Sequence, residues 1–267
     1  MANGAVIMSN FFLSSALITL AKISTGCDPD DDECDGQVYG FKPSSLISLI
    51  ATVTGILSAF LLPVIGAIVD YTKYRKEMGV AFAAFLIAIQ ATQIATYEAT
   101  WFPMAILQAI NGFNYQALTL AAYAYIPEIR RAVGEETMTV YTARFYTYMF
   151  GSEALFLAIV VGITLPMGAS DVLTGQIGQG VNVVMSGSFY ALASYYFTKK
   201  EPMRQLSEGT SLVWAGFKQV CITSKGIVEH YPKTLTWFLL GVVFAEAGKD
   251  SFCSILITLL GQVCIIC

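Results

Sequence analysis

Three stretches of this sequence are long, apolar and almost free of charge, and they constrain the fold more than any other feature. Residues 1–27 contain one charged side chain, Lys22, while residues 43–69 and 99–127 contain none. About 20 apolar residues suffice for a helix to cross a lipid bilayer. Only 13% of the residues are charged and 55% are hydrophobic, against about 25% charged in soluble proteins. The composition therefore also indicates a membrane protein.

These stretches and further apolar runs predict an all-α, polytopic membrane protein with about seven transmembrane helices. The expected spans are residues 4–22, 45–69, 78–97, 102–126, 143–165, 178–197 and 235–259. The first six would form one six-helix half over residues 1–198. A cytoplasmic linker, 199–233, would follow, and then the first helix of an incomplete C-terminal half, 234–267. Within the linker, SLVWAGFKQV mixes apolar and basic residues, which predicts a short helix at the membrane surface.

Basic residues are distributed unevenly among the connections between these spans. Twelve of the fifteen Lys and Arg residues lie in three alternate connections, and the connections between those hold almost none. Basic residues concentrate on the cytoplasmic side of a membrane. The pattern therefore predicts a cytoplasmic N-terminus.

The boundary between the second and third expected spans carries a motif. The sequence there reads PVIGAIVDYTKYRKEMG, in which Gly66 and Asp70 are followed by Arg75 and Lys76. This pattern resembles the signature of the major facilitator superfamily, and the longer run over residues 40–79 resembles its autophagy-related vacuolar amino-acid effluxers. The same family is resembled by the stretches MSNFFLSSALITLA, NGFNYQALTLAAYAYIPEI, FGSEALFLAI and WFLLGVVFAEAG.

The resemblance implies a secondary active transporter that exports amino acids from the vacuole by alternating access, in a multi-pass protein of the vacuolar membrane. The family has twelve membrane helices, so the resemblance also implies that this chain is truncated and lacks most of its C-terminal half. A truncated membrane protein without transport activity is the alternative. The fifth span begins with TARFYTYMFGSE, where the family has small residues, which predicts looser packing there.

Asp70 ends an apolar run at the C-terminus of a helix, where the helix dipole disfavours an anion by about 0.3–1 kcal/mol. We therefore expect a cation to compensate it, either Arg75 or Lys76, or one of the arginines at 130–131. In the superfamily the equivalent carboxylate latches the two halves together on the cytoplasmic side. The resemblance thus implies a gating role for Gly66, Asp70, Arg75 and Lys76, and the alternative is a simple stop signal at the membrane interface.

Ionisable side chains inside a bilayer are costly unless they are paired or hydrated, which makes them functional candidates. Glu153 lies within the fifth expected span, and Glu246 and Asp250 lie four residues apart on one face of the seventh. A carboxyl group in an apolar cavity can bind and release a proton near neutral pH. We expect one of the three to carry a coupling proton. The alternative is that Glu246, Lys249 and Asp250 neutralise one another structurally.

The fourth expected span carries a polar face within an uncharged run. Gln108 and Asn111 lie three residues apart, Asn114 follows, and Asn10 of the first span could face the same substrate cavity. Side-chain amides at this depth bind the amino and carboxyl groups of a small zwitterion, or they hydrogen-bond one helix to another. The sequence leaves both roles open.

Two cysteines, Cys27 and Cys34, bracket the acidic loop CDPDDDEC. They form a disulfide if that side of the membrane is oxidising, and they stay free thiols otherwise. The aspartates of the loop lack the spacing of a calcium site. We therefore expect no bound metal.

The sequence contains no recognisable enzyme motif, with one histidine and no glycine-rich phosphate loop. We expect no enzyme activity, no cofactor and no nucleic-acid partner, since membrane topology accounts for the basic loops. The expected partners are a small-molecule substrate, the lipid bilayer and the missing half. A seven-helix retinal protein would use Lys249 for its Schiff base, but the predicted cytoplasmic N-terminus opposes this alternative.

Overall fold

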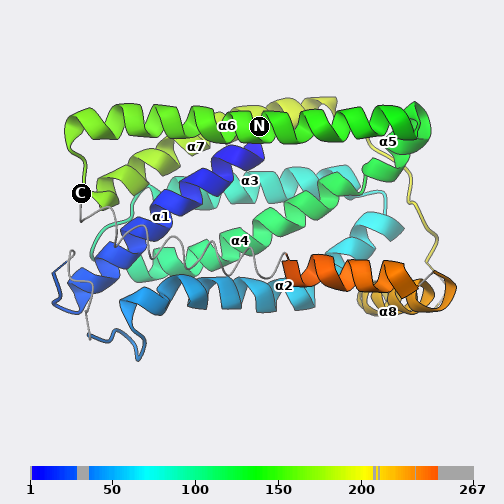
Figure 1. Cartoon of the computed structure of the whole chain (residues 1–267), viewed down its shortest axis with the longest axis horizontal. Helices are drawn as coiled ribbons and strands as arrows, with labels where there is room; N and C mark the ends of the chain where they lie inside the picture. Colours follow the sequence, from blue (N-terminus) through cyan, green and yellow to red (C-terminus); the bar gives the residue numbers. More distant parts are fainter. Residues whose placement is uncertain (1, 29–35, 207–208, 210, 232, 246–267) are drawn as a thin grey trace.

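The computed structural model describes residues 2–28, 36–206, 209, 211–231 and 233–245. Its helices lie side by side in an elongated bundle (Figure 1). They are α1 (Ala2–Ser24), the 3-10 helix η1 (Pro43–Ser45), α2 (Leu46–Tyr71), α3 (Arg75–Gln93), α4 (Trp101–Tyr123), α5 (Ile126–Val133), α6 (Glu135–Met167), α7 (Asp171–Tyr196) and α8 (Leu212–His230). A further helical segment covers Lys233–Ala245. The described residues form no strand, so the all-α prediction is confirmed.

Three helical segments are long and apolar enough to cross a membrane by length and composition alone. They are α1, the combined segment Pro43–Tyr71 and α6. α3, α4 and α7 have 19, 23 and 26 residues, which are also lengths that can span a bilayer, but buried amide side chains make them more polar. Lys233–Ala245 is a shorter apolar helix where the seventh span was expected. The architecture is that of a membrane protein with several spans.

Helix ends differ from the expected spans where the sequence contains turn and capping residues. The fourth span divides into α4 and the short α5, which has Pro127 in its first turn. α6 begins at Glu135, earlier than expected, and ends at Gly168, whose φ of 56° is the left-handed conformation that terminates helices. Ser170 then caps α7, because its side chain accepts a hydrogen bond from the backbone N–H of Leu173.

α1 runs obliquely between α6 and α2 (Figure 1) and packs against α4, α6 and α7. Small residues make these contacts close. A Cβ on Gly175 of α7 would lie 2.9 Å from the Cβ of Ala16, and one on Gly4 would overlap Ser152 of α6. Membrane helices use small residues in this way to bring their backbones together. α7, distant in sequence, therefore lies directly on α1.

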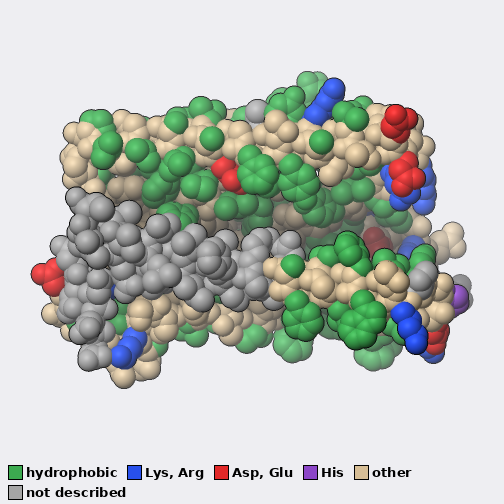
Figure 2. Space-filling view, viewed as in Figure 1, with side chains coloured by type: hydrophobic (Ala, Val, Ile, Leu, Met, Phe, Trp, Pro, Cys, Tyr) green, Lys and Arg blue, Asp and Glu red, His purple; other side chains and the backbone are tan. Residues whose placement is uncertain are grey.

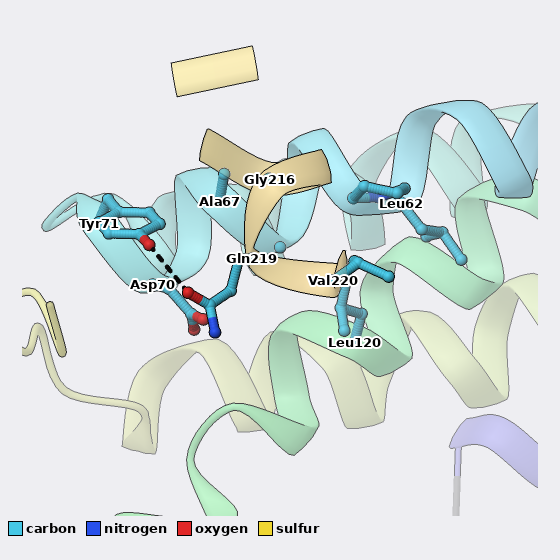
Figure 3. A pocket seen from close by; sticks show the side chains of 10 residues that line it. Leu62, Ala67, Asp70, Tyr71, Leu120, Gly216, Gln219 and Val220 are labelled. Carbon is cyan, nitrogen blue, oxygen red and sulfur yellow. Dashed lines mark hydrogen bonds between the residues drawn. The ribbon is translucent and has the colours of Figure 1, made fainter. Parts of the chain in front are cut away.

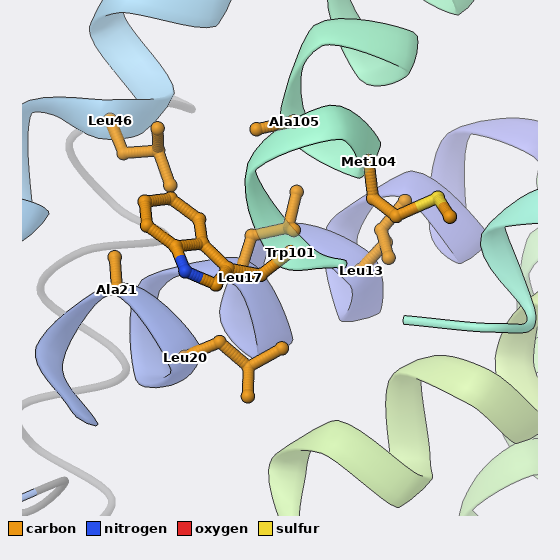
Figure 4. Close-up of a cluster of buried hydrophobic side chains, with 8 residues drawn as sticks. All are labelled: Leu13, Leu17, Leu20, Ala21, Leu46, Trp101, Met104 and Ala105. Carbon is orange, nitrogen blue, oxygen red and sulfur yellow. The ribbon is translucent and has the colours of Figure 1, made fainter. Parts of the chain in front are cut away.

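Apolar clusters occupy both ends of this helix packing. In the first, Leu13 and Leu17 of α1 meet Trp101 and Met104 of α4 (Figure 4). Toward the other end, Val6 of α1 packs with residues of α3 and α4, namely Leu86 and Leu118. A third cluster joins α2 to α4 through Ile65, Val69, Ala117 and Ala121. The layer between the first two clusters is polar, as described below.

The N-terminal half of α6 makes little contact with the rest of the described chain. Its buried residues, Ser152, Phe156, Val160 and Thr164, recur every four positions and begin only in its second half. Tyr148 and Phe150 are 56% and 60% exposed, and Figure 2 shows hydrophobic side chains along this helix. The exposure of these rings agrees with the looser packing predicted from the aromatic sequence.

The linker contains the expected helix, but that helix is longer than SLVWAGFKQV and packs on α2. α8 brings its only buried residues, Ala215 and Gly216, against the Pro63–Ala67 region of α2. A Cβ on Gly216 would overlap the Pro63 carbonyl oxygen. The linker is therefore an integral part of the packing at this end of α2.

Candidate functional site

The gating motif spans the end of α2 and the start of α3. Gly66 and Asp70 line a cavity of about 290 Å³ between α2, α4 and α8, whose other lining residues are Leu62, Pro63, Ala67, Tyr71, Leu120, Gly216, Gln219 and Val220. In Figure 3 the Tyr71 hydroxyl lies beside the Gln219 side chain, and it donates a 3.3 Å hydrogen bond to Gln219 Oε1. The Asp70 carboxylate lies next to this pair. The linker helix thus closes one side of the motif.

Arg75 of the motif is buried, with only 1% of its side chain exposed. Its Nη1 donates to Glu128 Oε1 of α5 at 2.7 Å and to the carbonyl oxygen of Ala124 at 3.4 Å. Its Nε donates to the Val69 carbonyl oxygen at 3.5 Å, and the guanidinium lies 5.1 Å from the centre of the Tyr125 ring. A buried charge needs partners of this kind, because unpaired burial is costly. Arg75 therefore ties α2, α3 and α5 together.

This arrangement corrects the expected compensation of Asp70. Arg75 pairs with Glu128, and Arg130 pairs with Glu135 at 2.8 Å, so neither neutralises Asp70. The Asp70 carboxylate has no ion pair with any side chain in the described part of the chain. Sequence reasoning missed Glu128, although it is the first charged residue after the uncharged run 99–127. That position was the one available signal.

The start of the linker is fixed to the same end of the bundle by polar contacts. Lys199 Nζ lies 2.6 Å from Glu77 Oε1, and Lys200 Nζ lies 3.6 Å from Glu128 Oε2. The Tyr125 hydroxyl donates a 3.3 Å hydrogen bond to the Thr198 carbonyl oxygen. The backbone N–H of Arg204 donates a 3.1 Å hydrogen bond to the carbonyl oxygen of Asp70. Among the described residues, charged side chains gather mainly at this end of the molecule (Figure 2). The hydrogen bond from Lys199 lowers the pKa of the exposed Glu77 carboxyl group.

The expected polar face of α4 lies inside the helical bundle. Gln108, Asn111 and Asn114 are 7%, 0% and 1% exposed. Asn114 donates a 2.9 Å hydrogen bond to the Phe82 carbonyl oxygen, and Gln108 accepts one of 3.1 Å from Gln93, both of α3. These bonds join α3 to α4, so part of the polar face hydrogen-bonds one helix to another. The substrate role of these residues stays a prediction.

Amides from four helices lie in the stretch of the bundle between the two apolar clusters that involve α1. Because α3 and α4 are antiparallel, the pairs Gln93–Gln108 and Phe82–Asn114 place Gln90 opposite the Gln108–Asn111 turn. From α7, Gln179 donates to the Ser9 carbonyl oxygen of α1 at 3.2 Å. We call this set the amide layer, and its members are Asn10 of α1, Gln90 and Gln93 of α3, Gln108, Asn111 and Asn114 of α4, and Gln179 and Asn182 of α7. Sequence reasoning missed the members from α3 and α7.

Many atoms of the amide layer have no hydrogen-bond partner among the described residues. Both amide atoms of Gln90 and of Asn111 are enclosed and unpaired. Single unpaired atoms are Asn10 Oδ1, Gln93 Oε1, Asn114 Oδ1, Gln179 Oε1 and Asn182 Nδ2. Buried polar groups are normally paired, and each exception calls for an explanation. The layer contains no charged side chain, so its chemistry is that of neutral donors and acceptors.

Glu153 lies on α6 beside α1, since a Cβ on Gly4 would approach its Cγ to 2.8 Å. This candidate carboxylate therefore lies where α6 packs on α1. Glu246, Lys249 and Asp250 lie outside the described residues.

The structure describes Cys27 but not Cys34 of the acidic loop. Cys27 is disulfide-bonded, while Cys34 lies outside the described residues, so the pairing of these two cysteines stays a prediction. Within the described ranges, no three His, Cys, Asp or Glu side chains are grouped so that they could hold a metal ion.

A helical bundle with apolar spans, amides buried at mid-span and charges gathered at one end defines a polytopic membrane protein of the transporter class. The chain matches the family model described as "Vacuole effluxer Atg22 like" over residues 2–264, and it belongs to that family. The family recognised in the sequence is thereby confirmed. A search of curated proteins and a search of solved structures gave no match. Membership makes the protein a membrane transporter of the vacuole effluxer type, with a small-molecule substrate.

Proposed function

We propose that this protein exports amino acids from the vacuole by alternating access. The amide layer is the observation that carries the proposal. Uncharged amides offer both donors and acceptors, which suit a zwitterion that carries an ammonium and a carboxylate. Asn10, Gln108, Asn111 and Asn114 are the proposed contacts.

The gating role belongs to the end of the bundle where Gly66, Asp70, Arg75 and Lys76 lie. Asp70 has no cation partner within the described chain, so it is available to a partner that arrives in another conformation. Arg75 has a structural role through Glu128 and would keep the two helices of the motif in place. The division into a first half, 1–198, a linker, 199–233, and a second unit from 234 stays part of the proposal, with α8 of the linker packed on α2 of the first half.

Proton coupling and orientation complete the proposal. The position of Glu153 against Gly4 of α1, within the helix packing, supports it as the coupling carboxylate, with Glu246 and Asp250 as further candidates. The N-terminus is cytoplasmic, because the basic connections around Arg75, Arg130 and Lys199 meet at one end, and that end carries the excess of Lys and Arg.

The test is transport by the 267-residue chain reconstituted into liposomes loaded with a radiolabelled amino acid. We expect efflux faster than from protein-free liposomes, and faster still with an acidic interior. Efflux at the protein-free rate would refute the transport proposal and favour the alternative of a non-transporting membrane protein. Efflux that ignores the pH gradient would refute proton coupling alone.

A further inference from the structure

We propose that Gln93 of α3 is a positioning residue that fixes the orientation of the Gln108 amide and so makes the site select substrates with a free carboxylate. This inference rests on the proposed function, because it concerns the substrate contact of the same site. It adds a residue from a helix that carries none of the predicted contacts.

The orientation of the Gln93 side chain is set by the backbone carbonyl group of Met104. Gln93 Nε2 lies 3.3 Å from the Met104 carbonyl oxygen and 3.1 Å from Gln108 Oε1. A carbonyl oxygen only accepts hydrogen bonds, so the end of the Gln93 side chain that faces Met104 must be its NH₂ group. The same NH₂ group faces Gln108. Gln108 must therefore present its oxygen to Gln93, and these two hydrogen bonds fix the orientation of the Gln108 amide.

The consequence is a free donor. With its oxygen occupied, Gln108 directs its NH₂ group away from Gln93, and this group has no hydrogen-bond partner among the described residues. Gln108 is 7% exposed, whereas Gln93 is fully buried, and the Gln108 nitrogen is not among the fully enclosed unpaired atoms of the layer. It can therefore be reached by a ligand. An NH₂ group donates to a carboxylate in a charge-assisted hydrogen bond and cannot accept from an ammonium.

Binding of two ligands to the 267-residue chain in lipid nanodiscs tests this orientation. Alanine has a free carboxylate, and alaninamide replaces it with a neutral amide. We expect the protein to prefer alanine. Gln93→Met removes the NH₂ group that orients Gln108, so the preference for alanine should fall by about tenfold or more. Binding of alaninamide should fall less, because its neutral carbonyl oxygen accepts a weaker hydrogen bond than a carboxylate does.

Leu86→Met is the matched control. Leu86 lies on the same helix and is as fully buried as Gln93, at 0% exposed, but it packs in an apolar cluster and does not belong to the amide layer. The preference for alanine should survive in this variant. Loss of the preference in both variants would show a general packing effect and overturn the inference.

A second variant guards against misfolding of the first. Gln108→Met should lose the same preference, and the double variant should be no worse than either single variant, because both act through one hydrogen-bonded unit. Fully additive losses would overturn the inference. Alanine binding with an unchanged preference in Gln93→Met would overturn it while leaving the proposed function in place. A wild-type chain that binds neither ligand would overturn the proposed function and this inference with it.

Discussion

Arg75 and Glu128 form a 2.7 Å ion pair in which the arginine side chain is 1% exposed and the glutamate 25%. The pair joins the start of α3 to the short helix α5, and Lys200 of the linker approaches the other carboxylate oxygen of Glu128. The motif arginine therefore holds the end of the bundle together, and the motif aspartate remains without a cation partner in the described chain. We therefore expect substitutions around Arg75 to change stability and a substitution of Asp70 to change transport.

Glu128→Gln should lower the free energy of unfolding by about 3 kcal/mol, because it leaves the buried Arg75 guanidinium without a counter-charge. The matched control is Glu135→Gln, which breaks an ion pair to Arg130 whose side chains are 58% and 80% exposed. Glu135→Gln should lower the free energy of unfolding by less than about 1 kcal/mol. Thermal unfolding in detergent measures both, and equal losses would contradict the structural role assigned to Arg75.

Asp70→Asn should leave the unfolding temperature nearly unchanged, because Asp70 has no ion pair to lose within the described residues. It should nevertheless impair transport, by about tenfold, which corresponds to about 1.4 kcal/mol. Efflux from liposomes and membrane insertion are the two measurements. Normal efflux in this variant would favour the simple stop signal over the gate.

Gly216→Ala should displace α8 from α2, since the new Cβ would overlap the Pro63 carbonyl oxygen. We expect a cost of about 1–3 kcal/mol in the docking of the helix and faster proteolysis of the linker. Gly226→Ala is the control on the same helix, because a Cβ there meets nothing within 4 Å. It should instead stabilise α8 by about 0.5–1 kcal/mol. Identical cleavage rates in the two variants would argue against the docking of α8.

Gln90→Met should raise the free energy of unfolding by about 1 kcal/mol, because it removes two buried polar atoms that have no partner. Gln179→Met provides the contrast, since Gln179 donates a hydrogen bond to the Ser9 carbonyl oxygen. Its loss should destabilise the protein by a similar amount. Thermal unfolding of the two variants should therefore shift in opposite directions, and shifts of the same sign would contradict the assignment of partners.

The ion pair between Glu77 and Lys199 should give a pH-dependent contribution to stability. The lowered pKa of Glu77 means that its contribution is present above the ordinary value of 4.5 and is lost as the pH falls through the lower folded value. The raised pKa of Lys199 means that its contribution is present below 10.5 and is lost as the pH rises beyond that value. Glu77→Gln should therefore lower the unfolding temperature at neutral pH but not in acid below this window. The difference should also shrink at high salt, because both side chains are exposed.

Particular residues show how far the sequence alone reached. The uncharged runs fixed the membrane environment and the all-α fold, because a backbone in lipid must satisfy its hydrogen bonds within helices. The Gly66–Lys76 motif identified the family. Both conclusions depend on local sequence, through the length of apolar runs and the spacing of charges.

The tertiary structure alone decided which side chains pair across helices. Arg75 lies five positions from Asp70 yet pairs with Glu128, because α5 places Glu128 beside the arginine. Gln93 and Gln179 showed no pattern in the sequence, since an isolated amide in an apolar helix looks the same whether it bonds a neighbour or a substrate. Their roles follow from which helices become neighbours, and that is set by the close approach of α1 to α7 and of α3 to α4, which no single helix encodes.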